Sequence, residues 1–404
     1  SYFDYFLSIN SYIITLIISF LTGSSLLFIG KKSEKTISFI EQLVLIILVY
    51  VVISFFIALP FYLSNYQVTF LNSLFEAISG TTGTGFSIFK NIKYLDPTLI
   101  LWRSSSQWIG GLYFLFFLII IFSNKQFNFK MIYLTYSGDG RINSESNIKD
   151  ILTKIFILYS ILTLVIFLLL NISEIRMFNS LNLSMSLIST GGFIPTNSLN
   201  NIIQSNAQKL VFIFSLLISM LNFFLLLNIF EKKIIIREHK EDFYLIILSI
   251  IFVLLIYLNN YSGLNIIISV ISSLGNSGLS LINSDNNLSL YFILLTLIGG
   301  SLISNTSGIK FTRIYVLLKT SSSEMIKLIS PNSVINKNIF GSEKKITDDN
   351  IKVSFLIFIS FFISLFFLSG ILIVDNINFE NAFKLSILTI TNTTISGMYG
   401  IQDM

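Results

Sequence analysis

The chain has 404 residues, of which 53% are hydrophobic and only 12% are charged. Soluble domains carry about 25% charged residues, so this composition indicates a polytopic membrane protein. The absence of cysteine excludes disulfides and thiolate metal sites, and the single histidine, His239, leaves little room for His-based catalysis. The net charge of +5 could indicate nucleic acid, but its distribution along the chain points to membrane topology and to no nucleic-acid partner.

Eight apolar segments reach or approach the roughly 20 residues that span a bilayer. They are 12–29, 39–63, 99–122, 151–170, 210–230, 243–258, 288–318 and 353–374. The seventh is interrupted by the polar run from Ser304 to Gly308. Most of the 26 Lys and Arg residues lie in one set of the connections between these segments. That set is therefore placed in the cytoplasm.

Four connections on the opposite side share one pattern, an apolar segment too short to span followed by small polar residues. The short segments are 68–78, 177–188, 264–273 and 379–390. The polar residues are Thr82, Gly83, Thr84 and Gly85; Thr190, Gly191 and Gly192; Asn276, Ser277 and Gly278; and Asn392, Thr393 and Thr394. Aligning the first three stretches places Gly85, Gly192 and Gly278 in one column. The pattern is an internal repeat with unequal spacing.

A half-helix that returns as extended backbone is a re-entrant loop. Irregular backbone at membrane depth must face protein or a water-filled cavity. The half-helix C-termini carry partial negative charge, and backbone carbonyls can replace the water shell of an ion. No aligned column holds Asp or Glu, and Mg²⁺ gives up its water reluctantly. The residues therefore predict a path for a monovalent cation, with K⁺ as the leading candidate. A short extracellular loop is the alternative for any single stretch.

Four motifs accompany these loops: EAISG at 76–80, LWRS with QWIGG at 101–111, STGGF at 189–193, and IGG with GIK at 298–310. In these motifs the chain resembles the Trk/Ktr/HKT potassium-transporter superfamily, and specifically its bacterial Trk-type (TrkH-like) membrane subunit. The resemblance implies an all-α polytopic fold with four helix–pore-loop–helix repeats around a central pore. Part of an extra helical hairpin precedes the repeats.

The resemblance also implies a division of the chain. Residues 1–37 form an extra transmembrane helix and a cytoplasmic turn, and 38–130, 145–240 and 241–330 form repeats 1, 2 and 3. Residues 331–350 are a cytoplasmic linker and 351–404 a partial repeat 4. In this reading the partner of the first helix lies before Ser1, and the second helix of repeat 4 lies beyond Met404.

By the same resemblance, the chain is the pore-forming subunit for potassium uptake in the bacterial inner membrane. K⁺ is expected at the thirteen polar loop residues, with membrane lipid around the helices. The gate is expected at Ser304, Asn305, Thr306, Ser307, Gly308 and Lys310. Relatives work as homodimers with a cytoplasmic, nucleotide-binding regulatory subunit (TrkA-like). This chain has no Walker-type loop and no GxGxxG, so no cofactor is expected in it.

Several alternatives stay open at the level of sequence. The fourth loop places Thr394 where the family pattern has Gly, unless its register shifts to Gly397. Thr394 in the pore would favour a weakly selective or Na⁺-permeable transporter. The run 304–307 is either a gate or a helix kink. Passive flux is preferred over H⁺ or Na⁺ coupling because no buried carboxylate relay is visible.

Single basic residues also allow two interpretations. Arg103 either anchors its helix at the membrane interface or braces the pore loops. Lys310 either snorkels to the cytoplasmic interface or acts in gating or partner contact. An intramembrane enzyme would need a nucleophile–base pair, an Asp dyad or a metal, and the apolar segments contain none of these. The protein is therefore not expected to be an enzyme.

Overall fold

The computed structural model describes residues 9–31, 38–123, 145–230, 240–258, 263–282, 286–333, 336–341 and 345–401. Within these ranges the secondary structure is helical and contains no β-strand, which confirms the predicted all-α fold. His239 lies outside the described residues.

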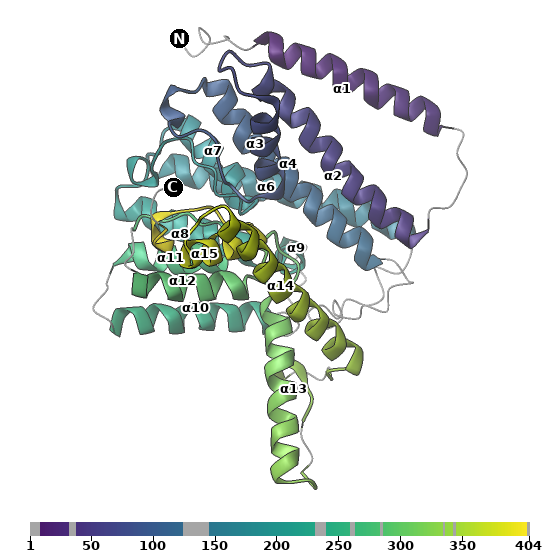
Figure 1. Ribbon diagram of the computed structural model, residues 1–404, viewed down its shortest axis with the longest axis vertical. Helices are drawn as coiled ribbons and strands as arrows, with labels where there is room; N and C mark the ends of the chain where they lie inside the picture. Colours follow the sequence, from purple (N-terminus) through teal and green to yellow (C-terminus); the bar gives the residue numbers. More distant parts are fainter. Residues whose placement is uncertain are drawn as a thin grey trace.

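Six of the described helices are long and apolar enough to cross a membrane. They are α1 (Ile9–Gly30), α2 (Phe39–Tyr62), α4 (Pro97–Ser123), α6 (Glu145–Ile172), α10 (Lys240–Leu258) and α14 (Asp348–Val374). α1 lies along the outside of α2 and buries only Ser11 and Thr15 (Figure 1). A helix satisfies its own backbone hydrogen bonds, so such apolar surfaces can face lipid.

A short helix follows the first long helix of each repeat. These half-helices are α3 (Phe70–Thr82), α7 (Met177–Ile188), α11 (Leu264–Leu274) and α15 (Phe379–Ile390). α7 and α15 match the predicted segments, whereas α3 continues past residue 78. Thr82 therefore belongs to the last helical turn, where its Oγ1 donates to the Ile78 carbonyl at 2.8 Å, and not to the extended stretch that follows.

The half-helices are packed inside the molecule through small polar side chains. α7 buries Ser180, Ser184 and Ser186, and α11 buries Ser272 and Ser273. Ser184 Oγ donates to the Leu181 carbonyl at 2.8 Å and Ser273 Oγ to the Ser269 carbonyl at 2.7 Å, so both hydroxyls are satisfied within their own helix. Small residues let helices approach closely in a membrane, where burial from water does not drive helix–helix contact. The Ser-rich half-helices can therefore sit deep within the bundle.

The sequence predicts one span over 210–230, but the structure breaks it. α8 (Asn206–Met220) and α9 (Phe223–Phe230) meet at an angle of 104°. Leu221 is extended, and Asn222 Oδ1 accepts a hydrogen bond from Phe224 N at 2.9 Å. Asn is a favoured helix N-cap because its side chain satisfies a free backbone N–H. Asn222 therefore starts a new helix where the hydropathy pattern alone suggested continuity.

The expected interruption of the segment 288–318 is longer than the sequence indicated. α12 (Asn286–Ile298) ends before Gly299, and α13 (Phe311–Ile329) begins only after Lys310. Gly299, Gly308 and Lys310 all have left-handed φ angles, of 72°, 82° and 78°, which helix interiors do not allow. Residues 299–310 are called the repeat-3 loop below. α13 then runs away from the other helices (Figure 1).

Short 3-10 turns complete the described chain. They are η1 (Ile92–Tyr94), η2 (Leu199–Asn201), η4 (Ile339–Gly341) and η5 (Gly397–Tyr399). The largest cluster of buried apolar side chains joins α6, α7, α8, α10, α11 and α12. The half-helices of repeats 2 and 3 therefore rest on a continuous core.

Candidate functional site

The four half-helices end in the same backbone conformation. The residues Gly83, Thr190, Asn276 and Asn392 have left-handed φ angles of 76°, 54°, 55° and 46°. A left-handed residue is the usual way to end a helix and turn the chain away from its axis. Each of these residues lies two positions before Gly85, Gly192, Gly278 or Thr394. The chain therefore leaves each helix in the same way.

Hydrogen bonding repeats in three of these turns. Gly191 N donates to Ser186 O at 2.9 Å, Ser277 N to Ser272 O at 3.0 Å, and Thr393 N to Leu388 O at 2.8 Å. Each bond spans the same number of residues and occupies a carbonyl that the helix end leaves free. In the first turn the equivalent bond is shifted by one residue, from Gly85 N to Ser79 O at 3.3 Å. The four loops are thus geometrically related.

The fourth loop aligns through Thr394 and not through Gly397. The left-handed Asn392 and the Thr393 N bond place Thr394 in the column of the three glycines. Gly397 instead begins the turn η5. Gly85, Gly192 and Gly278 have φ angles of 75°, 77° and 69°, whereas Thr394 is not left-handed. The backbone of the fourth loop therefore differs at this one position.

The loops 83–86, 190–193, 276–279 and 392–395 meet as a closed set, which we call the four-loop ring. A methyl group built on Gly85 would collide with the Gly191 carbonyl, and one on Gly192 with the Ser277 carbonyl. One on Gly278 would collide with the Thr394 backbone. Thr394 Oγ1 donates to the Thr84 carbonyl at 3.2 Å. Each loop therefore touches the next, and the fourth returns to the first.

Thr394 reaches further than to its neighbour. Its Oγ1 also lies 3.3 Å from the Gly191 carbonyl of the second loop, within hydrogen-bond distance. Methyl groups built on Gly85 or Gly192 would both collide with this oxygen. Since the second loop is opposite the fourth in the order of the ring, the Thr394 side chain extends across the ring.

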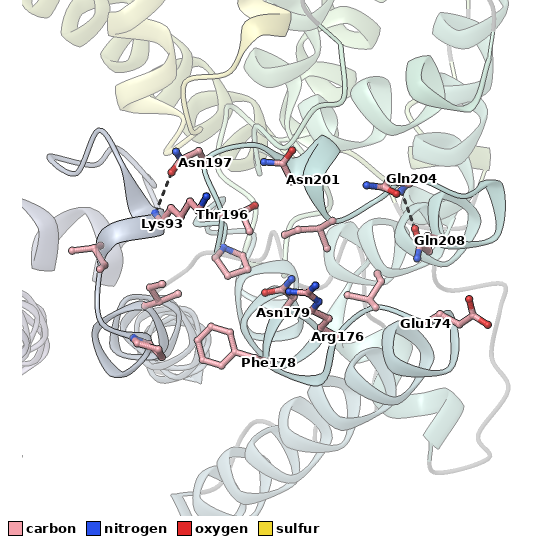
Figure 2. A pocket seen from close by; sticks show the side chains of 16 residues that line it. Lys93, Glu174, Arg176, Phe178, Asn179, Thr196, Asn197, Asn201, Gln204 and Gln208 are labelled. Carbon is pink, nitrogen blue, oxygen red and sulfur yellow. Dashed lines mark hydrogen bonds between the residues drawn. The ribbon is translucent and has the colours of Figure 1, made fainter. Parts of the chain in front are cut away.

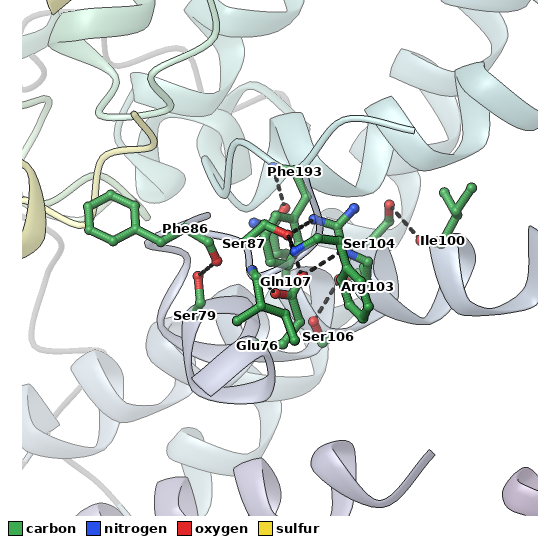
Figure 3. A network of polar contacts seen from close by, with 12 residues as sticks. Glu76, Ser79, Phe86, Ser87, Ile100, Arg103, Ser104, Ser106, Gln107 and Phe193 are labelled. Atoms are coloured by element: carbon green, nitrogen blue, oxygen red, sulfur yellow. Dashed lines mark hydrogen bonds and ion pairs between the residues drawn. The ribbon is translucent and has the colours of Figure 1, made fainter. Parts of the chain in front are cut away.

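A buried ion pair supports the first loop from behind. Arg103 Nε lies 2.7 Å from Glu76 Oε1, and the two side chains are 1% and 0% exposed. Glu76 also accepts from Ser87 Oγ at 3.0 Å and from Ile88 N at 2.9 Å. Arg103 lies over the Phe193 ring at 4.2 Å from its centroid, as Figure 3 shows. Arg103 thus braces two loops, and the interface-anchor interpretation is wrong.

Gln107, one helical turn after Arg103, holds the second loop with both ends of its amide. Its Nε2 donates to the Gly191 carbonyl, and its Oε1 accepts from Phe193 N at 3.1 Å (Figure 3). The amide has no exposed surface, so these bonds satisfy it where water cannot. The QWIGG motif therefore matters for the position of a loop in the next repeat.

The repeat-3 loop lies directly against the ring. Thr190 Oγ1 donates to the Asn305 carbonyl at 3.3 Å, and Asn392 Nδ2 donates to Ser307 Oγ at 3.2 Å. Asn305 Nδ2 donates in turn to the Ile188 carbonyl, the end of α7, at 2.9 Å. Asn305 and Ser307, within the run 304–308 where the sequence predicts a gate, thus contact the second and fourth loops.

Lys310 points into the repeat-3 loop and not toward the membrane interface. Its Nζ donates to the Ser301 carbonyl at 3.0 Å, to Thr306 Oγ1 at 2.9 Å and to the Thr306 carbonyl. The residue is only 6% exposed, which excludes snorkelling. Ser304 Oγ also bonds Thr306 Oγ1 at 2.7 Å. The ammonium group therefore holds the two sides of the loop together.

Cavities lie on both sides of the ring. One of about 700 Å³ is lined by Gly85, Gly192, Gly278 and Thr394 and by the residues that follow them. Another of about 350 Å³ is lined by residues that precede them, including Thr82 and Gly83, and by Asn305 and Ser307 of the repeat-3 loop. The ring therefore separates two spaces, and its backbone is the boundary between them.

A third cavity, of about 660 Å³, lies beside the ring between repeats 1 and 2. Figure 2 shows its polar wall, where Asn197 Oδ1 accepts from the Lys93 backbone at 3.3 Å and Gln208 Oε1 accepts from Gln204 N at 2.8 Å. Arg176, which immediately precedes α7, also lines it, and Arg176 is exposed. None of the four ring columns contributes to this cavity.

Two carboxylates that sequence reasoning missed lie close to the repeat-3 loop. Glu241 and Asp242, at the start of α10, are only 2% and 3% exposed. The sequence places them beside Lys240 in a charged connection, which is why they read as solvated. Both residues precede the predicted apolar segment 243–258, so the apolar segments still contain no acidic pair, although nothing in the local sequence indicates that this pair is buried. Their burial depends on partners at two helix breaks, Asn222 N and Leu302 N. A hydropathy pattern does not indicate such partners.

Replacing Gly192 with Ala is expected to reduce cation flux about tenfold. Ala at a left-handed φ costs roughly 1–2 kcal/mol, and the methyl group would also displace the Ser277 carbonyl. Flux into liposomes per folded protein measures the effect. Gly370→Ala is the matched control, because a methyl group there meets no atom within 4 Å. Equal flux in both variants would contradict the close contact between loops.

The sequence and the fold both resemble those of known proteins. The chain matches the sequence model of the TrkH family, described as cation transport protein, over residues 8–246, which is more than half of the chain. The uncharacterized cation transporter MJ1485 of Methanocaldococcus jannaschii is 28% identical over 319 residues, covering 76% of this chain and 65% of that protein. The chain thus spans slightly less than two thirds of that relative's length.

Two further relatives extend over more of the chain. The Trk system potassium uptake protein TrkG of Escherichia coli K12 is 24% identical over 395 residues, covering 92% of this chain and 80% of TrkG. The crystal structure of the potassium transporter TrkH from Vibrio parahaemolyticus superposes with a TM-score of 0.78 at 19% identity, covering 95% of this chain and 82% of that one. The fold is thus that of TrkH, an all-helical polytopic membrane protein. The chain belongs to the TrkH family of cation transport proteins, a family of transporters and not of enzymes.

Proposed function

We propose that this chain forms a transmembrane path for K⁺, in which the four-loop ring selects the ion through backbone carbonyls and hydroxyls. The observation that carries the proposal is the ring itself, four related loops that touch in order between two cavities. Relatives named as potassium uptake proteins support K⁺ as the transported ion. The filter residues are those predicted from sequence, with Thr82 contributing from the helix end instead of the extended stretch.

The electrostatics of the ring suit a monovalent cation. The four half-helices direct the negative ends of their dipoles toward the ring. No ring position is acidic, since the loops contain Gly, Thr, Asn and Ser at the aligned columns. Neutral carbonyls can replace the water around K⁺, whereas a divalent ion holds its water more strongly. Selection by dehydration therefore fits these residues better than attraction by a carboxylate ring.

The repeat-3 loop is proposed as the gate. Its Asn305 and Ser307 bond the ring loops directly, so the loop lies in the way of an ion leaving the ring on that side. Lys310 holds the loop folded through the Ser301 and Thr306 carbonyls. Flux then requires the loop to move away, a small rearrangement of a segment that is not helical.

The assembly proposed is a homodimer in the inner membrane of a bacterium, surrounded by lipid. A cytoplasmic nucleotide-binding subunit of the TrkA type would supply regulation, because this sequence has no nucleotide motif of its own. Passive flux down the membrane potential is the proposed mode, because the described residues that line the two cavities beside the ring include no carboxylate, and Glu241 and Asp242 instead bond the helix breaks.

A reversal-potential measurement tests the proposed selectivity. The full-length protein in planar bilayers, with K⁺ on one side and Na⁺ on the other, is expected to shift its reversal potential toward the K⁺ equilibrium potential. A potential that follows only Na⁺ would contradict the proposal. Thr84→Val, which keeps side-chain volume but removes a hydroxyl from the ring, is expected to change the ratio of permeabilities.

A Na⁺-permeable transporter is the second candidate, and one observation favours it. Thr394 lacks the left-handed backbone of the three glycines, and its hydroxyl bonds the Thr84 and Gly191 carbonyls. Because the backbone of one loop differs from that of the other three, the ring carbonyls surround K⁺ less symmetrically. The same reversal-potential measurement decides between the two ions.

A further inference from the structure

The helix breaks of repeats 2 and 3 are bonded to each other. Ser301 N donates to the Met220 carbonyl at 3.2 Å, and Phe223 N donates to the Ile303 carbonyl at 2.8 Å. Met220 and Phe223 flank the break between α8 and α9, and the other two residues begin the repeat-3 loop. The backbone N–H and C=O groups that lack helical partners at one break thus hydrogen-bond to those at the other break.

Two adjacent carboxylates reinforce this junction from α10. Glu241 Oε1 accepts from Leu302 N at 3.1 Å and from Thr312 Oγ1, so it joins the loop to the first turn of α13. Asp242 Oδ1 accepts from Asn222 N at 2.9 Å, inside the break that starts α9. Neighbouring residues of one helix therefore hold two different breaks. We call Glu241, Asp242 and their partners the carboxylate clasp.

The packing at the junction leaves no room for sliding. A methyl group on Gly300 would lie 3.0 Å from the Met220 carbonyl and 2.7 Å from Thr306 Oγ1. Thr312 is fully buried, as are Met220 and Phe223. A buried carboxylate oxygen that loses its donor costs free energy, so the Leu302 N, Thr312 Oγ1 and Asn222 N donors are expected to stay in place. The start of the loop, the start of α9 and the start of α10 thus form one body.

We propose that the carboxylate clasp makes α9 and residues 300–303 of the repeat-3 loop move as a single unit. Glu241 and Asp242 are then positioning residues, and a displacement of α9 carries the loop away from the ring. The inference rests on the proposed role of the loop as a gate. Coupling of this kind needs a contiguous body that two sites share, and the clasp supplies it.

Engineered disulfides test the clasp, since the chain contains no native cysteine. Phe223→Cys with Ile303→Cys joins α9 to the loop inside the unit, at the point where Phe223 N donates to the Ile303 carbonyl at 2.8 Å, and Thr190→Cys with Asn305→Cys joins the loop to the ring. Flux of Rb⁺ into liposomes is compared for each variant before oxidation, after oxidation and after reduction, with disulfide formation followed by mass spectrometry. Only the second bond is expected to block flux, by at least tenfold and reversibly.

The two bonds separate the possible failures. A Phe223–Ile303 disulfide that also blocks flux shows the loop moving relative to α9, which overturns the clasp proposal. A Thr190–Asn305 disulfide that leaves flux unchanged shows that the loop does not gate, which overturns the proposed function instead.

Charge removal gives a second measurement that does not depend on disulfide formation. Glu241→Gln and Asp242→Asn keep side-chain size but weaken the clasp, so the loop is freed from α9. Flux per folded protein is expected to rise several-fold, with the K⁺/Na⁺ reversal potential unchanged. Glu174→Gln, at an exposed carboxylate, is the matched control. Flux equal to that of the wild type, or a shifted reversal potential, contradicts the positioning role.

Discussion

Replacing Arg103 with Ala is expected to destabilise the protein by about 3–5 kcal/mol, the cost of leaving one member of a buried ion pair unpaired. Glu76 would remain with no exposed surface and without the guanidinium that lies 2.7 Å away. Ser87 and Ile88, which Glu76 also holds, would lose their fixed position after the first loop. Thermal unfolding in detergent, followed by tryptophan fluorescence, measures the loss.

A double variant separates charge from position. Glu76→Gln combined with Arg103→Leu leaves no uncompensated charge, so we expect it to be more stable than Arg103→Ala alone. Its flux should nevertheless stay low, because the brace on Phe193 is gone. Arg176→Ala, at an exposed arginine that immediately precedes α7, is the control and should unfold as the wild type does. An Arg103→Ala protein as stable as this control would show that the pair does not hold the loops.

The sequence predicted the helices and the half-helices well because both leave simple signals. Long apolar runs report membrane spans, and the Gly/Thr stretches report where a helix must end. α15, for example, begins and ends where the change from apolar to small polar residues indicated. The columns of the ring were also visible, since glycine is the residue that a left-handed turn selects. At Asn276 and Asn392 the same turn uses asparagine, the next most tolerant residue.

What the sequence could not predict depends on contacts between distant segments. The break at Asn222 lies inside an unbroken apolar run, and it exists because Asp242 and the repeat-3 loop satisfy its backbone. The burial of Glu241 depends on Leu302 and Thr312, far along the chain. Arg103 reads equally as an interface anchor until Phe193 is placed against it. Local composition does not carry this information.

The fourth loop shows where both kinds of information are needed. Sequence allowed either Thr394 or Gly397 in the fourth column, and the left-handed Asn392 favours Thr394. Only the fold then places the Thr394 hydroxyl on carbonyls of the first and second loops. Thr394 thus departs from the family pattern and also extends its side chain across the ring. A substitution there is therefore the most informative test of the proposed ion path.

Thr394→Gly is accordingly expected to raise K⁺ flux and the K⁺/Na⁺ permeability ratio, each by about tenfold. A cation crossing the ring competes with the Thr394 hydroxyl for the Thr84 and Gly191 carbonyls. Each such hydrogen bond contributes about 0.5–1.5 kcal/mol net, and about 1.4 kcal/mol corresponds to a tenfold change in occupancy. Removing the side chain frees both carbonyls and the space in front of Gly85 and Gly192.

Two further substitutions at the same position separate hydrogen bonding from bulk. Thr394→Ser keeps the hydroxyl and should resemble the wild type in its permeability ratio. Thr394→Val keeps the volume but cannot donate, so the carbonyls are free while the methyl groups still extend across the ring. We expect its flux to stay low, because an apolar group there offers an ion no ligand. Wild-type flux and reversal potential in Thr394→Gly would place the ion path elsewhere than through the four-loop ring.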